Sequence, residues 1–181
     1  MNELKEKSSA GLTTAFLTFF VLFFNFESRG QMPQLFTEEV LSLTLSGDLK
    51  TVFKDRGDDS QYHPAELSYF SDQKKVSIPL KIKTRGNFRK SASNCKYPPL
   101  MLNFPNSEVI DNTLFSGQNK MKLVTPCQGD EYTVHEYLVY KLYNLFSPQS
   151  FQGQLLKISF QDTLKRKKVR TYYGLLLENE D

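Results

Sequence analysis

Five cations gather in a short stretch that interrupts two apolar segments of the chain. They are Lys83, Arg85, Arg89, Lys90 and Lys96. Gly86, directly after Arg85, lets the backbone turn with its amide groups exposed, and Lys96 can approach from the opposite side. Backbone amides together with a bidentate arginine suit a phosphate or a carboxylate. The stretch therefore predicts an anion site, and a solvated surface turn is the alternative.

A second candidate for chemistry is a lysine on a short strand that is followed by an acid on a helix. Lys122 lies in the apolar segment 120–124, and Glu136 lies one turn into the helix expected after it. In kinase-like nucleotide sites a strand lysine holds the α- and β-phosphates and is itself held by a helix glutamate. We expect a Lys122–Glu136 pair, with two separate solvent-facing charges as the alternative. Lys120 shares the face of Lys122, so the pattern leaves open which lysine would bind.

Cys95 and Cys127 are the only cysteines of the chain. An even count in an oxidising compartment favours one disulfide. Such a bridge would close a loop of about thirty residues and stabilise the fold by roughly 3–4 kcal/mol. A zinc site is not expected, because neither cysteine has a CxxC partner and the histidines are only His63 and His135. Two unpaired buried thiols are the alternative.

Residues 1–30 have the pattern of a signal peptide. Lysines precede the apolar run 15–26, and Ser28 and Gly30 provide a small-x-small cleavage site. The run is shorter than the ~20 residues that a membrane-spanning helix needs and has the length of a signal-peptide core. We expect export to the periplasm, the cell surface or the medium. An uncleaved membrane anchor, the one route by which we expect this chain to meet a membrane, is the alternative.

The rest of the chain is expected to form short strands and one long helix. Alternating apolar and polar residues predict strands at 41–45, 66–70, 76–84, 100–104, 120–124, 154–160 and 169–178. Asp48 is expected to cap a brief helix at 49–54. A longer amphipathic helix is predicted at 130–146 with Asp130 as its N-cap. Its apolar face is expected to consist of Val134, Leu138, Leu142 and Leu145.

This order predicts an α+β fold, in one domain over residues 31–181, with a mostly antiparallel sheet and one main amphipathic helix. Such a sheet leaves a face uncovered, and one helix covers only part of it. Leu175 and Leu177 have the pattern of buried residues although Asp181 ends the sequence. We therefore expect a further element or a partner to cover this part of the sheet.

Four stretches, in order, resemble the amino-terminal part of the spore-coat CotH-type kinase family. They are RGNFRKSASNCKYPPLMLNF, LFSGQNKMKLV, VHEYLVYKLYNLF and YYGLLLENED. The family is similar in fold to secreted atypical protein kinases, and its members phosphorylate serine on partner proteins with ATP and a divalent metal. The resemblance thus implies the nucleotide-side lobe of such a kinase, with ATP and a metal as cofactors. A protein substrate or a missing C-terminal lobe would be the partner.

The resemblance also assigns roles to individual residues. Its nucleotide-side positions correspond to Arg85, Gly86, Asn87, Lys96, Lys122, Glu136 and Glu178. The first three form the family's R-G-N turn, and Glu178 falls near the boundary between lobes. The metal-binding and catalytic aspartates of the family lie in a second lobe, and nothing in this chain takes their place. We therefore expect no catalytic residue here and no activity of this chain alone.

The competing hypothesis is a non-catalytic exported module, stapled by the disulfide, that binds a protein or a glycan. Its binding surface would be an exposed sheet edge with some of the 15 Phe and 9 Tyr residues. Nucleic acid is not expected as a partner, because the net charge is only +3 and the chain is predicted to be exported. No nucleophile motif of the GxSxG type occurs.

Overall fold

The computed structural model describes residues 35–105, 110–147, 149–164 and 169–179. The predicted signal peptide, residues 1–30, lies outside these ranges, as does the basic loop 165–168 between the last two strands. Within the described ranges, no helix is both long and apolar enough to cross a bilayer.

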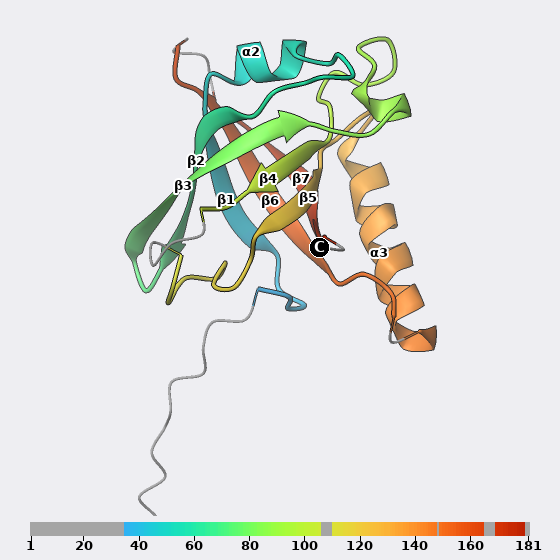
Figure 1. Cartoon of the computed structure of the whole chain (residues 1–181). Coiled ribbons are helices and arrows are strands. Elements are labelled where there is room, and N and C mark those ends of the chain that lie inside the picture. The colour runs from blue at the N-terminus through green and yellow to red at the C-terminus, as the bar shows by residue number, and fades with distance from the viewer. Residues whose placement is uncertain (1–34, 106–109, 148, 165–168, 180–181) are drawn as a thin grey trace, which may run out of the picture. The chain divides into compact units, whose positions relative to one another are not determined.

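The described strands close into a barrel (Figure 1). Its strands are β1 (Leu41–Gly47), β2 (His63–Ser71), β3 (Lys74–Thr84), β4 (Leu100–Asn103), β5 (Lys120–Val124), β6 (Gly153–Asp162) and β7 (Arg170–Glu178). Their order around the barrel is β1-β2-β3-β4-β5-β7-β6. Neighbouring strands are antiparallel except β1 and β6, which pair in parallel from Leu41 opposite Leu156 to Gly47 opposite Asp162. An odd number of strands cannot alternate in direction all the way round, so one parallel pair is unavoidable.

The predicted fold class is therefore wrong. The chain does not form the mostly antiparallel sheet with one helix, like the lobe of a kinase, that the sequence suggested. It forms a closed barrel of mixed strand direction beside one long helix. The physical reason lies in the uncovered sheet face, because a sheet that curls on itself buries one face and removes its edges. The strands themselves were placed well, but alternation carries no information on which strand pairs with β1.

The barrel interior is filled by the apolar side of each strand. Leu43, Leu45, Ile78, Leu80 and Ile82 are buried there, as the alternation predicted. The same cluster holds Leu67, Leu100, Leu102, Met121, Leu123, Leu156, Ile158 and Leu176. Burial of this many side chains supplies the main driving force for folding, at about 25 cal/mol per Å² of apolar surface.

One end of the barrel is covered by the short helix α2 (Leu49–Lys54). The Asp48 carboxylate accepts a hydrogen bond from the backbone N–H of Thr51 at 3.2 Å, which confirms the predicted cap. Leu49 and Val52 are buried in the core beneath this helix. Helix α2 thus closes the barrel end at which β1 and β6 finish.

The long helix α3 (Asp130–Phe146) lies against the outside of the barrel (Figure 1). Tyr137 packs there on a second apolar cluster that includes Leu155, Leu175 and Leu177. The burial expected for Leu175 and Leu177 is thus confirmed, and α3 is the element that covers them. The helix begins at Asp130 with Gly129 as its N-cap, so the predicted cap is wrong by one residue.

Of the predicted apolar face of α3, only Val134 packs against the barrel, on the second apolar cluster. Leu138, Leu142 and Leu145 are exposed, while Thr133 and Tyr137 are buried. Helical spacing shows which residues share a face but not which face meets the protein. Here the packing of Tyr137 and the ion pair of Glu136 with Arg89, which the spacing does not encode, orient the helix.

Candidate functional site

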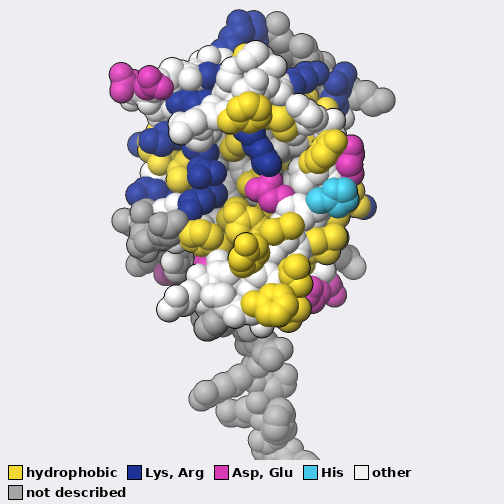
Figure 2. All heavy atoms as spheres, turned by 90° about the vertical axis from the view of Figure 1, so that its right-hand side faces the viewer, with side chains coloured by type: hydrophobic (Ala, Val, Ile, Leu, Met, Phe, Trp, Pro, Cys, Tyr) yellow, Lys and Arg dark blue, Asp and Glu magenta, His cyan; other side chains and the backbone are white. Residues whose placement is uncertain are grey.

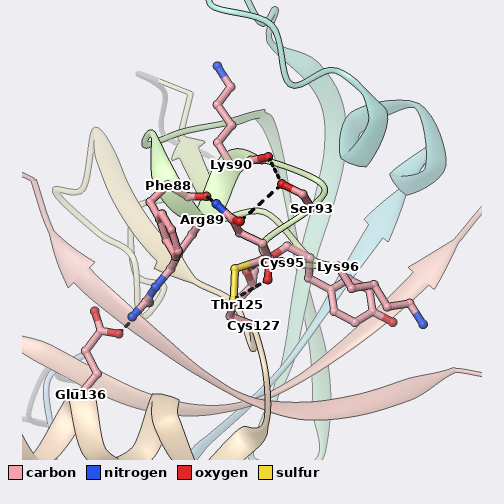
Figure 3. The surroundings of a disulfide bond; sticks show 12 residues. Phe88, Arg89, Lys90, Ser93, Cys95, Lys96, Thr125, Cys127 and Glu136 are labelled. Atoms are coloured by element: carbon pink, nitrogen blue, oxygen red, sulfur yellow. Dashed lines mark hydrogen bonds and ion pairs between the residues drawn. A yellow bond between two sulfur atoms is a disulfide. The ribbon is translucent and has the colours of Figure 1, made fainter.

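Cys95 and Cys127 form a disulfide, which confirms the predicted pairing (Figure 3). The bridge ties the cationic loop between β3 and β4 to the segment that leads from β5 into α3. A hydrogen bond from the Thr125 hydroxyl to the carbonyl oxygen of Tyr97, at 2.8 Å, ties the same two segments. The loop is therefore fixed to the barrel by a covalent bond and a polar contact.

Arg56, just after α2, holds the same loop from another side. Its guanidinium donates to the carbonyl oxygens of Phe53 at 2.6 Å, Lys90 at 3.1 Å, Cys95 at 2.8 Å and Lys96 at 2.7 Å. Burial lowers the pKa of Arg56. Arg56 was not among the predicted site residues, because it lies far from the cationic loop in the chain. It thereby fixes the backbone at Lys96.

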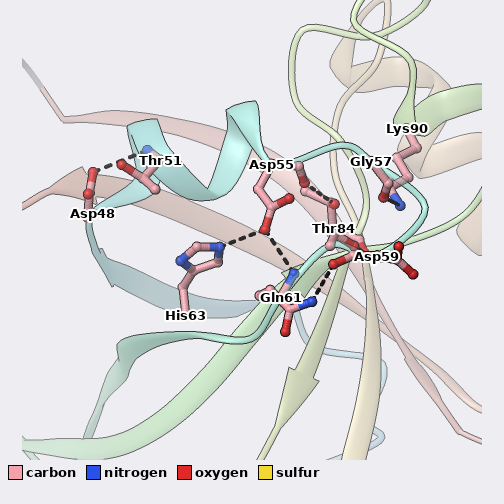
Figure 4. A network of polar contacts seen from close by, with 10 residues as sticks. Asp48, Thr51, Asp55, Gly57, Asp59, Gln61, His63, Thr84 and Lys90 are labelled. Carbon is pink, nitrogen blue, oxygen red and sulfur yellow. Dashed lines mark hydrogen bonds and ion pairs between the residues drawn. The ribbon is translucent and has the colours of Figure 1, made fainter.

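A polar network fixes the turn that carries Arg56 (Figure 4). The Asp55 carboxylate accepts hydrogen bonds from the backbone N–H of Gln61 and from His63 Nε2, each at 2.9 Å. These contacts, the one to His63 first, hold the pKa of Asp55 below its ordinary value. The Thr84 hydroxyl donates to the Asp55 carbonyl oxygen, which joins the turn to the end of β3.

Arg85 and its neighbours form the turn that the sequence predicted. Gly86 has a φ of 80°, a conformation that favours glycine. Asn87 precedes the short 3-10 helix η2 (Phe88–Lys90). The Arg85 side chain is partly buried, which lowers its pKa, and Tyr140 and Glu136 of α3 oppose that shift. Arg85 thus faces α3.

Glu136 pairs with Arg89 at 2.7 Å, and not with Lys122 as expected (Figure 3). The Lys122 ammonium lies 4.4 Å from the ring centroid of Phe151, over its face. The Glu178 carboxylate accepts a backbone hydrogen bond at 2.8 Å from the loop before β6. The predicted lysine, helix acid and hinge acid therefore each have a different neighbour in the fold.

The phosphate corner that the resemblance implies for Arg85 and Lys96 stays a prediction. Figure 3 shows Arg89 and Lys96 directed to opposite sides of the disulfide. Lys96 lines a pocket at the α2 end of the barrel, and Arg85 does not line it. ATP and a divalent metal therefore stay predictions of the family resemblance.

The pocket that Lys96 lines has a volume of about 600 Å³. Its rim carries cations from α2, from the cationic loop and from the start of β7. They are Lys50, Lys54, Lys96 and Arg170. Asp162, the last residue of β6, also lines it and accepts backbone hydrogen bonds from Lys50 and Leu164, each at 3.0 Å. The charge around this pocket is therefore predominantly positive.

Aromatic rings form the apolar part of the pocket. Tyr97 stacks on Phe160 with ring centroids 5.5 Å apart and planes at 16°, and Phe53 meets both rings edge-on. The hydroxyls of Tyr97 and Tyr172 are 3.0 Å apart. Burial, followed by that hydrogen bond, raises the pKa of Tyr97 to about 12. The phenol therefore stays neutral at physiological pH and presents a rigid, uncharged surface.

The rim cations are available to a ligand. Among the described residues, the ammonium groups of Lys50 and Lys54 make no ion pair. The Lys96 ammonium lies 5.6 Å from the centroid of the Tyr97 ring. The neighbouring phenol groups, that of Tyr172 first and then that of Tyr97, raise the pKa of Arg170. The arrangement can hold a negatively charged group at the rim and pack an apolar ring face against the aromatic wall.

Of the residues that line the pocket, Lys96 is the one that was predicted as a site residue. Phe160 and Arg170 lie opposite each other on β6 and β7, and the pairing of β1 with β6 brings Phe53 of α2 to the same barrel end. The β1–β6 pairing joins segments far apart in the chain, so the sequence gave no sign that Phe53 meets the other two. The one available signal was the Lys96-Tyr97 dipeptide, a cation next to an aromatic ring beside Cys95.

No protein-family model and no curated protein matches this chain. Its function has to follow from the chemistry of the pocket.

Proposed function

We propose that this chain is an exported, non-catalytic module that binds an acidic glycan in the pocket at the α2 end of the barrel. The observation that carries the proposal is the combination of a cationic rim with an aromatic wall. Lysine and arginine pair with carboxylate or sulfate groups through charge-assisted hydrogen bonds. Flat aromatic side chains offer apolar area for the carbon face of a sugar ring.

The pocket has the form of a binding site. Its volume falls within the range of small-molecule sites, roughly 300–1,000 Å³. Disulfide, hydrogen bonds and Arg56 hold the segment that carries Lys96 and Tyr97, so little ordering is left to occur on binding. Because the rim is already ordered, it favours tight binding of a ligand, and binding alone requires no catalytic group.

The disulfide supports the exported location that the proposal requires. Disulfides persist in oxidising compartments and are rare where thiols are kept reduced. Barrel closure also changes the binding-module hypothesis, because it removes most of the exposed sheet edge on which that hypothesis relied. We therefore propose the pocket, and not a sheet edge, as the binding surface.

The test is calorimetric titration of the full chain with a uronic-acid trisaccharide and with a neutral trisaccharide of the same length. We expect the acidic sugar to bind, and raised salt to weaken it because rim charges are screened. Lys96→Ala and Arg170→Ala should each weaken binding roughly tenfold, the loss of one charge-assisted contact. Lys74→Ala, an exposed lysine at the start of β3, is the matched control and should bind normally.

Equal affinity for both sugars, or no affinity for either, would overturn the proposal. A parallel titration with Mg·ATP separates it from the nucleotide-lobe hypothesis. Binding of Mg·ATP that is lost in Lys122→Ala and kept in Lys96→Ala would favour the nucleotide lobe. The reverse pattern would assign the anion to the pocket.

A further inference from the structure

Strand β3 is much longer than its neighbour β4, and a second pocket lies where the two strands separate. β3 has 11 residues, but only residues 81–84 pair with the four residues of β4. Over residues 74–80, β3 continues beside β2 without β4 on its other side. The pocket at this place, called here the β3–β4 pocket, has a volume of about 550 Å³. That volume suits a small ligand.

Two buried residues of the core contribute to the lining of the β3–β4 pocket. Leu80 is 5% exposed and Phe104 is 3% exposed. The Phe104 ring stacks on Phe115 with centroids 5.0 Å apart, and the backbone N–H of Phe104 donates to the carbonyl oxygen of Asn119 at 2.8 Å. This hydrogen bond joins the end of β4 to the start of β5. The pocket is therefore built on a part of the barrel that is already fixed.

Three prolines also line the β3–β4 pocket. They are Pro64 near the start of β2, Pro79 within β3 and Pro105 after β4. A proline ring has almost no rotamer freedom to lose when a ligand packs against it, and the same holds for Ala65 between them. Because the apolar wall is ordered in advance, binding costs little conformational entropy there.

The polar side chains that line the pocket are Lys81, Asn103 and Asn119. Among the described residues, none of the three side chains makes a hydrogen bond or an ion pair. Lys81 lies opposite Asn103 in the β3–β4 ladder. Both point out of the barrel, because their neighbours Ile82 and Leu102 are buried inside. The pocket thus presents one ammonium and two amide groups to a ligand.

The described residues that line the β3–β4 pocket include no acid. Glu66 lies opposite Pro79 on the same outer surface, but its carboxylate is engaged elsewhere. It accepts a hydrogen bond from the Ser77 hydroxyl at 3.1 Å and pairs with Lys75 at 3.5 Å. The Lys81 charge therefore has no counterion from the described part of the chain, and this favours an anionic ligand.

We propose that the β3–β4 pocket binds a small organic acid in which an apolar body carries a single carboxylate. The Lys81 ammonium donates a charge-assisted hydrogen bond to the carboxylate, and the Asn103 and Asn119 amides add neutral donors. The apolar body packs on the proline rings and on Phe104. A phosphate ester fits less well, because one ammonium does not balance two negative charges.

This site is separate from the pocket at the α2 end, with which it shares no lining residue. The pocket at the α2 end has a rim of several cations and a wall of stacked aromatic rings. The β3–β4 pocket has one cation and a wall of prolines. The proposal for the organic acid therefore stands whether or not an acidic glycan binds at the α2 end.

The test is nuclear magnetic resonance of the isotope-labelled full chain, titrated with phenylbutyrate. The side-chain amide signals of Asn103 and Asn119 report directly on the β3–β4 pocket. Phenylbutanol has the same apolar body without the charge and is the matched ligand. We expect both amide signals to shift with the acid, and the alcohol to bind roughly tenfold more weakly.

Three variants check the role of each polar group. Lys81→Met keeps the apolar stem, removes the charge and should weaken binding of the acid roughly tenfold or more. Asn119→Ala removes one neutral hydrogen bond and should weaken it roughly threefold. Lys74→Met, at the start of the same strand and outside the pocket, is the matched control and should bind normally. All three side chains are exposed, so circular dichroism should be unchanged.

An acid with an apolar body can also reach two other surfaces, and further variants separate them. The outer side of α3 gathers exposed hydrophobic side chains (Figure 2), and Leu142→Ser with Leu145→Ser reduces this surface. Lys96→Ala removes a cation from the pocket at the α2 end. The shifts of Asn103 and Asn119 should persist in both variants, because neither change touches the β3–β4 pocket.

The proposal fails on any of three results. The first is an unshifted pair of amide signals at about 10 mM phenylbutyrate, well above the roughly millimolar dissociation constant expected for a ligand of this size. The second is an equal response to phenylbutanol, which would leave Lys81 without a role. The third is an undiminished response in Lys81→Met, because the carboxylate would then be held elsewhere.

Discussion

Replacing Arg56 by methionine should destabilise the whole domain, although Arg56 lies outside the apolar core. The side chain links α2 to the cationic loop through hydrogen bonds to the carbonyl oxygens of Phe53, Lys90, Cys95 and Lys96. Arg56→Met keeps the length of the apolar stem and removes every donor. The carbonyl groups of the loop then need water in place of the guanidinium.

The magnitude follows from the number and setting of these bonds. A hydrogen bond to a charged group contributes about 1.5–3 kcal/mol when well shielded, and a typical one about 0.5–1.5 kcal/mol. Arg56 is only partly buried, and water can reach some of the freed carbonyls, so the lower value applies. We expect a total loss of about 2–4 kcal/mol. For a domain of this size the midpoint of thermal unfolding should fall by roughly 5–15 °C.

The assay is urea unfolding of the full chain, followed by circular dichroism and tyrosine fluorescence. Arg89→Met is the matched control, because Arg89 makes one partly exposed ion pair, with Glu136, worth about 0–1 kcal/mol. We expect Arg56→Met to be clearly the less stable of the two. If both variants unfold at the same urea concentration, Arg56 does not hold the loop and our account of how Lys96 is placed fails.

Three further predictions use other parts of the fold. Replacing Cys95 and Cys127 by alanine should lower the free energy of unfolding by roughly 3–4 kcal/mol, measured against the oxidised protein in urea. Tyr97, with a raised pKa of about 12, favours folding below about pH 10, and this contribution fades as the pH rises toward 12. In an ultraviolet titration Tyr97→Phe should remove part of the late phenol ionisation, and an unchanged late phase would contradict the assigned burial. Gly174→Ala would place Cβ 3.0 Å from a side-chain methyl carbon of β6 and should cost about 1–3 kcal/mol, whereas Gly57→Ala meets nothing within 4 Å and should be neutral in the same assay.

The strands could be predicted because their inward and outward residues alternate. Ile78, Leu80 and Ile82 are buried while Lys81 between them is exposed, and this pattern is visible in the sequence. The closure of the barrel could not be predicted in the same way. Leu41 and Leu156 meet across more than half the chain, and no local pattern marks them as partners. Pairing over such a separation is decided by burial of the whole sheet face.

The orientation of α3 shows a different limit of the sequence. Leu138, Leu142 and Leu145 share a face, as predicted, but that face points to solvent. The inner side is fixed instead by Tyr137 and by ion pairs such as Glu136 with Arg89. Helical periodicity assigns residues to a face, and the partner that each face meets comes from residues distant in the chain.

The cationic loop shows why residues that cluster in a sequence need not cluster in space. Its turn and its 3-10 helix point successive side chains in different directions. Arg89 meets Glu136, the Lys90 ammonium donates to the carbonyl oxygen of Gly57, and the Lys83 ammonium lies 4.8 Å from the ring centroid of Tyr62. Arg89 and Lys90 fasten the loop to its surroundings, and Lys83 lies at the end of β3 just before it. Lys96 reaches the pocket instead, and there it meets cations from α2 and β7. An anion site that looked local in the chain is therefore proposed at a place where distant elements contribute the charge.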